Sequence, residues 1–131
     1  MKVLVDTSIW SYALRSPKLE FIDKVNTLKN LINDQRTMIL GVIKQELLSG
    51  YRDKNKFNKL VNKLKPFNNI PILEQDYIQA AEFSSTCRSK GVQGSPIDFL
   101  ICAVAHRLDI TIFTTDKDFT HYQKHIPINL L

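Results

Sequence analysis

Three short runs of apolar and β-branched residues constrain the fold of this chain more than any other feature. Each run is followed by a pattern of apolar residues at helical spacing. The runs are Lys2–Val5, Thr37–Gly41 and Ile110–Thr114. Runs of this kind are typical of parallel strands that are covered on both faces. The alternation therefore predicts an α/β fold with a parallel sheet between helices.

Helical patterns fill most of the remaining sequence. Pro66 ends the fourth predicted helix, and the segment Gly91–Ser95 separates the fifth from the sixth. Ile70–Leu73, which contains a proline, and Ile128–Leu131 are expected to be short edge strands at most. The predicted helices are Thr7–Leu14, Lys18–Asn33, Val42–Gly50, Lys54–Lys65, Gln75–Lys90, Pro96–Leu108 and Asp118–Lys124.

The length of 131 residues, with 44% hydrophobic and 24% charged side chains, predicts one globular domain over residues 1–131. The first apolar run is only three residues long after Lys2, which is too short for a signal peptide, and no later run approaches a membrane span. We therefore expect a cytoplasmic protein without a membrane segment. Cys87 and Cys102 are expected to be reduced structural residues.

The net charge of +5 is concentrated between Lys44 and Lys65, where seven basic residues stand against two acidic ones. Such a stripe is typical of proteins that bind polyanions, because lysine and arginine contacts release the counterions of phosphates. The alternative is a solvated helix face, because apolar residues recur at i, i+3, i+4 and i+7 from Phe57 to Leu64. The candidate RNA-binding residues are Arg15, Lys18, Arg52, Lys56, Lys59 and Lys63.

Acidic residues follow the predicted strands or lie in the helices that leave them. Asp6 follows the first strand and Asp116 follows the third, so both are placed where ligands bind to open α/β sheets. Either residue could instead be a helix N-cap, and so could Asp118. Asp98 stands three residues after Ser95, which is also the spacing of a capping pair.

Taken together, these acids predict a metal site. Several carboxylates at one end of a sheet repel one another unless cations neutralise them. Oxygen ligands without paired cysteine or histidine favour Mg²⁺ or Mn²⁺ over Zn²⁺. His121 and His125 have the spacing of a helical metal pair but lack an accompanying acidic motif, so we expect them to be surface residues. His106 is expected at a helix end.

Four segments of the sequence strongly resemble the PIN domain, and more narrowly the VapC toxins of type II toxin-antitoxin modules. The resemblance spans nearly the whole chain in the order of the family's motifs. The segments are Val5-Asp6-Thr7-Ser8-Ile9-Trp10, Glu46-Leu47-Leu48-Ser49-Gly50, Ser95-Pro96-Ile97-Asp98-Phe99-Leu100-Ile101-Cys102-Ala103 and Thr114-Thr115-Asp116-Lys117-Asp118-Phe119.

This resemblance implies a three-layer α/β/α PIN-like fold with a short, mainly parallel central sheet. It also implies an endoribonuclease that uses Mg²⁺ or Mn²⁺ and activated water to leave a 5′-phosphate and a 3′-hydroxyl. The implied partners are RNA, a VapB-type antitoxin and a second copy of the chain in a homodimer. The implied metal and catalytic residues are Asp6, Glu46, Asp98 and Asp116, supported by Thr7, Ser8, Thr114 and Asp118.

Two alternatives stay open within the same fold. One is an RNA-processing nuclease outside any toxin-antitoxin system, and the other is a non-catalytic RNA-binding domain. The complete acidic set argues against the second. A haloacid-dehalogenase phosphatase would need a second aspartate two residues after Asp6, where this chain has Ser8. A receiver domain would need an acidic pair near the first strand, and none is evident.

Overall fold

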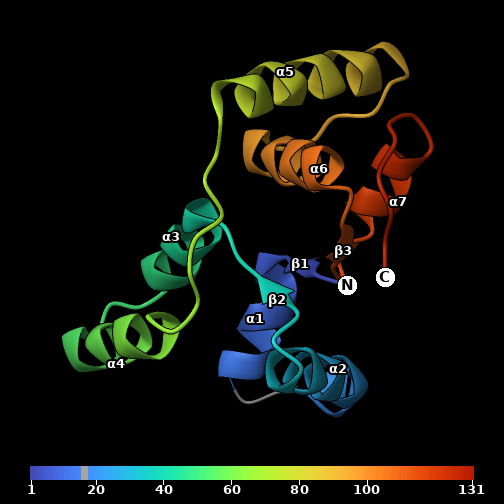
Figure 1. Ribbon diagram of the computed structural model, residues 1–131. Coiled ribbons are helices and arrows are strands. Elements are labelled where there is room, and N and C mark those ends of the chain that lie inside the picture. The colour runs from blue at the N-terminus through green and yellow to red at the C-terminus, as the bar shows by residue number, and fades with distance from the viewer. Residues whose placement is uncertain (16–17) are drawn as a thin grey trace.

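A three-stranded parallel sheet organises the computed structural model, which describes residues 1–15 and 18–131 (Figure 1). The strands β1 (Val3–Val5), β2 (Thr37–Met38) and β3 (Thr111–Phe113) are arranged in the order β2-β1-β3. Val3 pairs with both Thr37 and Thr111. The parallel sheet predicted from the three apolar runs is confirmed, and its central strand is the one that leads into Asp6.

The second strand is shorter than predicted. Thr37–Gly41 was expected to be extended, but only Thr37–Met38 pairs with β1. Ile39 turns to a different partner, because the Ile70 N–H donates to its carbonyl at 3.0 Å. Gly41 already belongs to the next helix. Strand β2 thus ends three residues earlier than the apolar run suggested.

The two predicted edge segments contribute single bridges instead of strands. Asn69, one residue before the segment Ile70–Leu73, bridges to Ile39 in parallel. Leu130 bridges to Ile112 of β3. Gly41, the next residue that could bond at this edge, already belongs to the following helix, which explains why the first pairing stops there.

Seven α-helices are present in the described part of the chain, close to the predicted ranges. Their bounds are α1 (Thr7–Leu14), α2 (Ile22–Asn33), α3 (Gly41–Ser49), α4 (Lys54–Leu64), α5 (Glu74–Ser89), α6 (Pro96–Leu108) and α7 (Asp118–Gln123). The prediction of one helix from Lys18 to Asn33 is wrong in its first turn. That turn is a 3₁₀ helix, η1 (Leu19–Phe21), and α2 begins only at Ile22. The Phe21 backbone leaves helical geometry, and its ring stacks on Tyr12 of α1 at a centroid distance of 3.8 Å.

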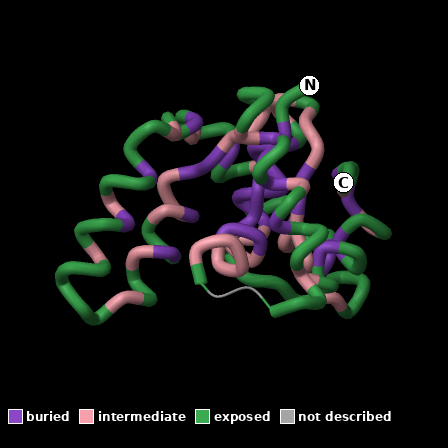
Figure 2. Tube along the Cα trace, turned by 90° about the horizontal axis from the view of Figure 1, so that it is seen from below, coloured by how far each residue is buried: buried purple, intermediate pink, exposed green. Residues whose placement is uncertain are grey.

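The helices form layers on the two sides of the sheet. Helices α1 and α2 lie on one side, α5 and α6 lie on the other, and α3 and α4 extend laterally (Figure 1). Buried residues are concentrated in the middle of the molecule, whereas the outer turns of the peripheral helices are exposed (Figure 2). All residues of α6 from Phe99 to Ala105 are buried. This buried helix carries Asp98 in its first turn. Within the described residues, no helix combines the length and apolar character needed to cross a membrane.

Candidate metal centre

Asp6 is buried at the carboxyl end of β1, with only 5% of its surface exposed. It occupies the N-cap position of α1, but its side chain makes no capping hydrogen bond. Its Oδ2 instead accepts from Thr114 Oγ1 at 2.8 Å and from Ser8 Oγ at 3.1 Å. Its N–H donates to the Phe113 carbonyl at 2.9 Å. The capping alternative therefore does not account for this carboxylate, which is held between the ends of β1 and β3.

The two hydroxyl groups that hold Asp6 also organise the loop after β3. Ser8 Oγ accepts from the Thr115 N–H at 3.2 Å, and Thr114 Oγ1 accepts from the Asp116 N–H at 3.0 Å. Each hydroxyl thus donates to a carboxylate and accepts from a backbone amide. Ser8 and Thr114, both predicted as supporting residues, connect Asp6 to the segment that carries Asp116.

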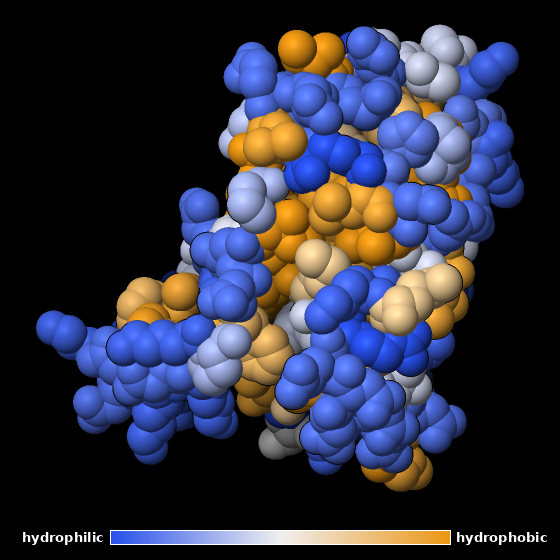
Figure 3. Space-filling model, in the orientation of Figure 1, coloured by the Kyte–Doolittle hydropathy of each residue, from blue (hydrophilic) through white to orange (hydrophobic). Residues whose placement is uncertain are grey.

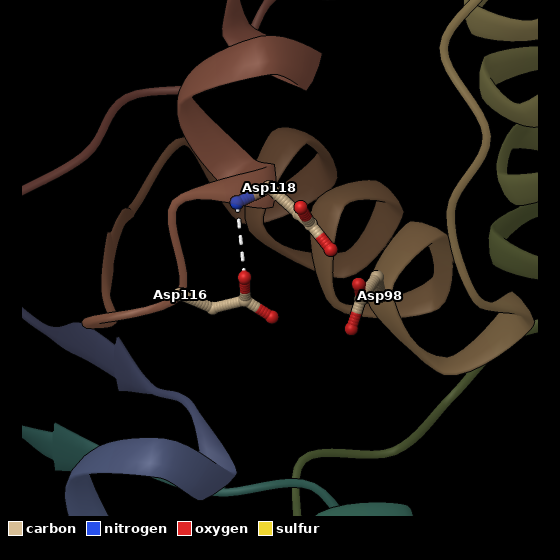
Figure 4. Close-up of side chains that lie close together, drawn as sticks. All are labelled: Asp98, Asp116 and Asp118. Carbon is tan, nitrogen blue, oxygen red and sulfur yellow. Dashed lines mark hydrogen bonds between the residues drawn. The ribbon is translucent and has the colours of Figure 1, made fainter.

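Three carboxylates, from α6 and from the loop and helix after β3, point toward a common space (Figure 4). Asp98, Asp116 and Asp118 each place one oxygen within 4.8 Å of the others, and we call these three residues the acidic cluster. The Asp118 N–H donates to Asp116 Oδ1 at 2.9 Å, so Asp116 also stabilises the start of α7. Asp118, predicted only as an auxiliary residue, is a full member, while Asp6 and Glu46 fall outside this group.

The electrostatics of the cluster are most apparent at Asp98. Burial, together with the negative charges of Asp6 and Asp116, raises the pKa of Asp98 to about 6, against a hydrogen bond from Tyr122 that favours the charged form. One hydrogen bond of the predicted capping pair is present, because the Asp98 N–H donates to Ser95 Oγ at 3.1 Å. The Asp98 side chain itself faces the other acids, so at neutral pH it is an anion in an unfavourable environment.

Glu46 reaches the site through a single contact. It is exposed on α3, and its Oε1 accepts from Thr7 Oγ1 at 3.0 Å. Because Thr7 directly follows Asp6, this bond brings α3 to the start of α1 beside the acidic site. Glu46 and Thr7 are therefore near the predicted centre without belonging to the acidic cluster.

The donor set fits a hard divalent cation. Carboxylate oxygens are the ligands that Mg²⁺ and Mn²⁺ prefer, and a cation would stabilise the charged form of Asp98, whose pKa is raised by burial and by the nearby acids. Burial raises the pKa of the Cys102 thiol, so this nearby residue is a neutral core group and no soft ligand. His121 and His125 belong to no group of three potential ligands in the described part of the chain.

A basic face lies apart from the acidic cluster, on α4 and the end of α1. Lys56, Lys59 and Lys63 of α4 and Arg15 line one concave surface of about 340 Å³, together with Tyr51 and two leucines. We call Arg15 and these three lysines the basic face. Figure 3 shows hydrophilic side chains over the outer side of α4.

The apolar residues of α4 pack toward the core, as their spacing predicted. Leu60 and Leu64 are buried, and Leu60 also lines the concave surface of the basic face. Of the other candidate RNA-binding residues, Lys18 and Arg52 are both exposed but do not line the concave surface of the basic face. The structure therefore brings together four of the six candidates.

Tyr122 contacts the site directly, although it was not among the site residues predicted from the sequence. Its hydroxyl donates to Asp98 Oδ2 at 2.8 Å, and the residue is fully buried on α7. A signal was present, because Tyr122 follows Phe119 at helical spacing, and a buried tyrosine hydroxyl needs a hydrogen-bond partner. The identity of that partner depends on the packing of α7 against α6, which the sequence does not reveal.

Several known structures resemble this fold, whereas no curated protein matches the sequence. The fold resembles the structure of FitAcB from Neisseria gonorrhoeae, with a TM-score of 0.79, 24% identity, and coverage of 98% of this chain and 96% of that one. It also resembles VapBC2 from Rickettsia felis bound to a DNA fragment from their promoter, with a TM-score of 0.77, 18% identity, and coverage of 100% and 98%.

A third similar structure is VapBC-1 from nontypeable Haemophilus influenzae, with a TM-score of 0.72, 15% identity, and coverage of 100% of this chain and 97% of that one. The model of the PIN domain family matches residues 3–125, which include the whole sheet and all the acids described above. The chain therefore belongs to the PIN domain family, whose members are nucleases.

Proposed function

We propose that this protein is a Mg²⁺- or Mn²⁺-dependent endoribonuclease and the toxin of a type II toxin-antitoxin system. The observation that carries the nuclease proposal is the convergence of the acidic cluster beside buried Asp6 at the carboxyl ends of β1 and β3. Carboxylates that repel one another in the folded protein form a site prepared for cations. This site lies within the segment that matches the PIN domain.

Some residues of the site would bind the cation, and others hold those residues in position. Asp98, Asp116 and Asp118 offer oxygens to the cation, and Asp6 adds negative charge close to Asp98. Ser8 and Thr114 fix the Asp6 carboxylate by donating to it. When bound, the divalent ion would withdraw charge from the scissile phosphate and lower the pKa of an attacking water.

Glu46 would complete the site from α3. Its hydrogen bond with Thr7 fixes one oxygen, Oε1, at the start of α1, and the second oxygen carries no hydrogen bond within the described residues. An exposed carboxylate with one free oxygen can hold a water molecule of the cation's hydration shell, because Mg²⁺ keeps several waters in proteins. We therefore assign Glu46 to the outer part of the metal site.

The basic face would hold the RNA backbone. An acidic site repels a polyanion before cations bind, so positive charge elsewhere has to retain the substrate. Arg15 and the lysines of α4 supply that charge on one concave surface. The guanidinium of Arg15 lies 5.8 Å from the Tyr51 ring centroid, and this contact keeps Arg15 beside α4.

The toxin role and its partners follow from similarity in fold. Structures similar to this chain are named as FitAcB and VapBC assemblies. We propose that a VapB-type antitoxin binds this chain, that the chain forms a homodimer, and that it acts on cellular RNA in the cytoplasm. Tyr77 and Ile78, both 54% exposed on α5, provide apolar surface suited to a contact between two copies.

A cleavage assay with purified protein tests the nuclease proposal. Wild type should cut RNA in Mg²⁺ or Mn²⁺ and stop in excess EDTA, and the variants Asp6→Asn and Asp98→Asn should be inactive. Asp34→Asn is the matched control, because Asp34 is an exposed acid at the end of α2. Equal cutting by all four proteins, or cutting that persists in EDTA, would overturn the proposal.

Growth experiments test the toxin role separately. Induced expression of wild type without an antitoxin should arrest growth, and Asp98→Asn should not. An active nuclease that cells tolerate would instead favour an RNA-processing role. Such a result would leave the assignment of the metal site intact.

A further inference from the structure

Tyr122 and Gly94 lie outside the acidic motifs, yet both belong to the surroundings of Asp98. The Tyr122 hydroxyl donates to Asp98 Oδ2 at 2.8 Å, and the backbone N–H of Asp98 is bound separately by Ser95. This bond from α7 fixes one oxygen of the Asp98 carboxylate.

The tyrosine ring is fixed on two sides. It packs against Phe99 of α6 with a centroid distance of 4.8 Å and against Phe119 of α7 with a centroid distance of 5.3 Å. None of the Tyr122 surface is exposed to solvent. Burial, together with the hydrogen bond to Asp98 and the nearby acids, raises the pKa of Tyr122, so its hydroxyl remains a proton donor.

Tyr122 also belongs to the helix that supplies a ligand. Asp118 lies in the first turn of α7, four residues before Tyr122, and residues four apart lie on the same face of a helix. The same face of α7 thus carries Asp118, which belongs to the acidic cluster, and one turn later Tyr122, which holds Asp98. The relative positions of these two acids depend on a single short helix.

Gly94 provides the space that the hydroxyl occupies. A Cβ atom at this position would lie 2.3 Å from the Tyr122 hydroxyl oxygen and 2.6 Å from the adjacent ring carbon. Both distances are shorter than any contact that carbon and oxygen atoms tolerate, so any larger residue would displace the tyrosine. Gly94 is thus required here because it lacks a side chain.

From these contacts we infer that Tyr122 is a positioning residue for the metal site: it orients the Asp98 carboxylate relative to Asp118, and Gly94 makes room for it. This inference rests on the proposed metal-dependent function. A hydrogen bond to one carboxylate oxygen would leave the other oxygen available to a cation. Partners of this kind typically contribute about 10- to 100-fold to metal affinity.

Direct Mn²⁺ binding, measured by electron paramagnetic resonance or calorimetry, tests the inference without relying on cleavage. Tyr122→Phe keeps the ring and removes the hydroxyl, so Mn²⁺ affinity should fall by about tenfold while the far-ultraviolet circular dichroism is unchanged. Gly94→Ala should weaken binding at least as much, because its Cβ would press on the ring as well as on the hydroxyl. Tyr12→Phe keeps the ring that stacks on Phe21, removes a hydroxyl on α1 outside the acidic cluster, and should bind Mn²⁺ like wild type.

Cleavage provides a second measurement. The Mn²⁺ concentration for half-maximal cleavage should rise in Tyr122→Phe, and RNA affinity should stay the same. If Tyr122→Phe binds Mn²⁺ as tightly as wild type or more tightly, the inference is overturned and the nuclease proposal stands. If wild type neither binds Mn²⁺ nor cleaves RNA, both are overturned.

Discussion

The acidic site and the basic face of α4 are built in different ways. The basic face needs little more than one helix, since three of its four residues come from Lys54–Leu64 and line one concave surface. The acidic site needs the whole fold, because Asp6 and Asp98 are more than 90 positions apart in the sequence. The pattern of one helix is enough to create a charged surface. Bringing together like charges that are distant in the sequence requires the folded sheet, because the rest of the structure has to offset their repulsion.

This difference suggests that substitutions in the two regions should affect different kinetic constants. Substitutions in the acidic site should change the chemical step and the metal dependence. Substitutions in the basic face should change RNA affinity and its response to salt.

Asp116→Asn should lower kcat by about 100-fold or more, because it removes a carboxylate from the acidic cluster. The amide of asparagine can still accept the Asp118 N–H, so the start of α7 should be preserved. RNA affinity, measured by fluorescence anisotropy in EDTA, should not decrease. A variant that keeps wild-type kcat would show that Asp116 is only a helix cap.

Lys59→Ala combined with Lys63→Ala should weaken RNA binding on the order of tenfold at low salt and leave kcat unchanged. The slope of log affinity against log salt should become shallower by about 0.7 for each lysine that contacts a phosphate of single-stranded RNA. A matched control is Lys29→Ala with Lys90→Ala, which removes the same charge from exposed positions outside the basic face. Equal weakening by both pairs would mean that net charge alone attracts RNA.

Asp53→Ala should destabilise the protein by about 1 kcal/mol, because the Asp53 side chain caps α4 by accepting from the N–H groups of Asn55 and Lys56. Denaturant unfolding measures this loss. Metal affinity should be unchanged, since α4 supplies no member of the acidic cluster. Loss of Mn²⁺ binding in Asp53→Ala would show that the two regions are coupled.

A further expected effect is a dependence of stability on pH. The folded protein raises the pKa of Asp98 from its usual 3.8 to about 6, so the folded state binds this proton more tightly than the unfolded chain does. Stability from this residue is therefore greatest when Asp98 is protonated and falls as pH rises from about 4 to about 6. In EDTA, Asp98→Asn should melt above wild type at pH 7, and the difference should shrink toward pH 4.

A divalent cation should reverse the order of the melting temperatures of wild type and Asp98→Asn. Added Mn²⁺ should raise the melting temperature of wild type and not that of Asp98→Asn, because the cation stabilises the charged form. Melting curves with and without Mn²⁺, with Asp34→Asn as the control, measure both effects. An Asp98→Asn protein that melts below wild type in EDTA would contradict the assignment of Asp98 as a strained anion.

The sequence predicted the sheet, because each buried parallel strand is a nearly continuous apolar run, and it predicted most helices from their spacing. It did not predict where β2 ends, since Ile39 fits a strand equally well whether it pairs with β1 or with Asn69. The same limit applied to the site. Asp6, with its strand-end position, was identifiable, but the Tyr122 hydroxyl bond and the membership of Asp118 arise from the packing of α7 on α6.

The pairing of β3 with β1 also has a consequence for the order in which the molecule can become active. During synthesis Asp6 leaves the ribosome among the first residues, but the hydroxyl of Thr114 and the acids at positions 116 and 118 leave more than 100 residues later. Because β3 lies directly beside β1, these acidic and hydroxyl groups meet only when that late strand docks on the early one. A nascent chain that ends before β3 therefore lacks an assembled site, and the proposed nuclease activity would arise only when the domain is nearly complete.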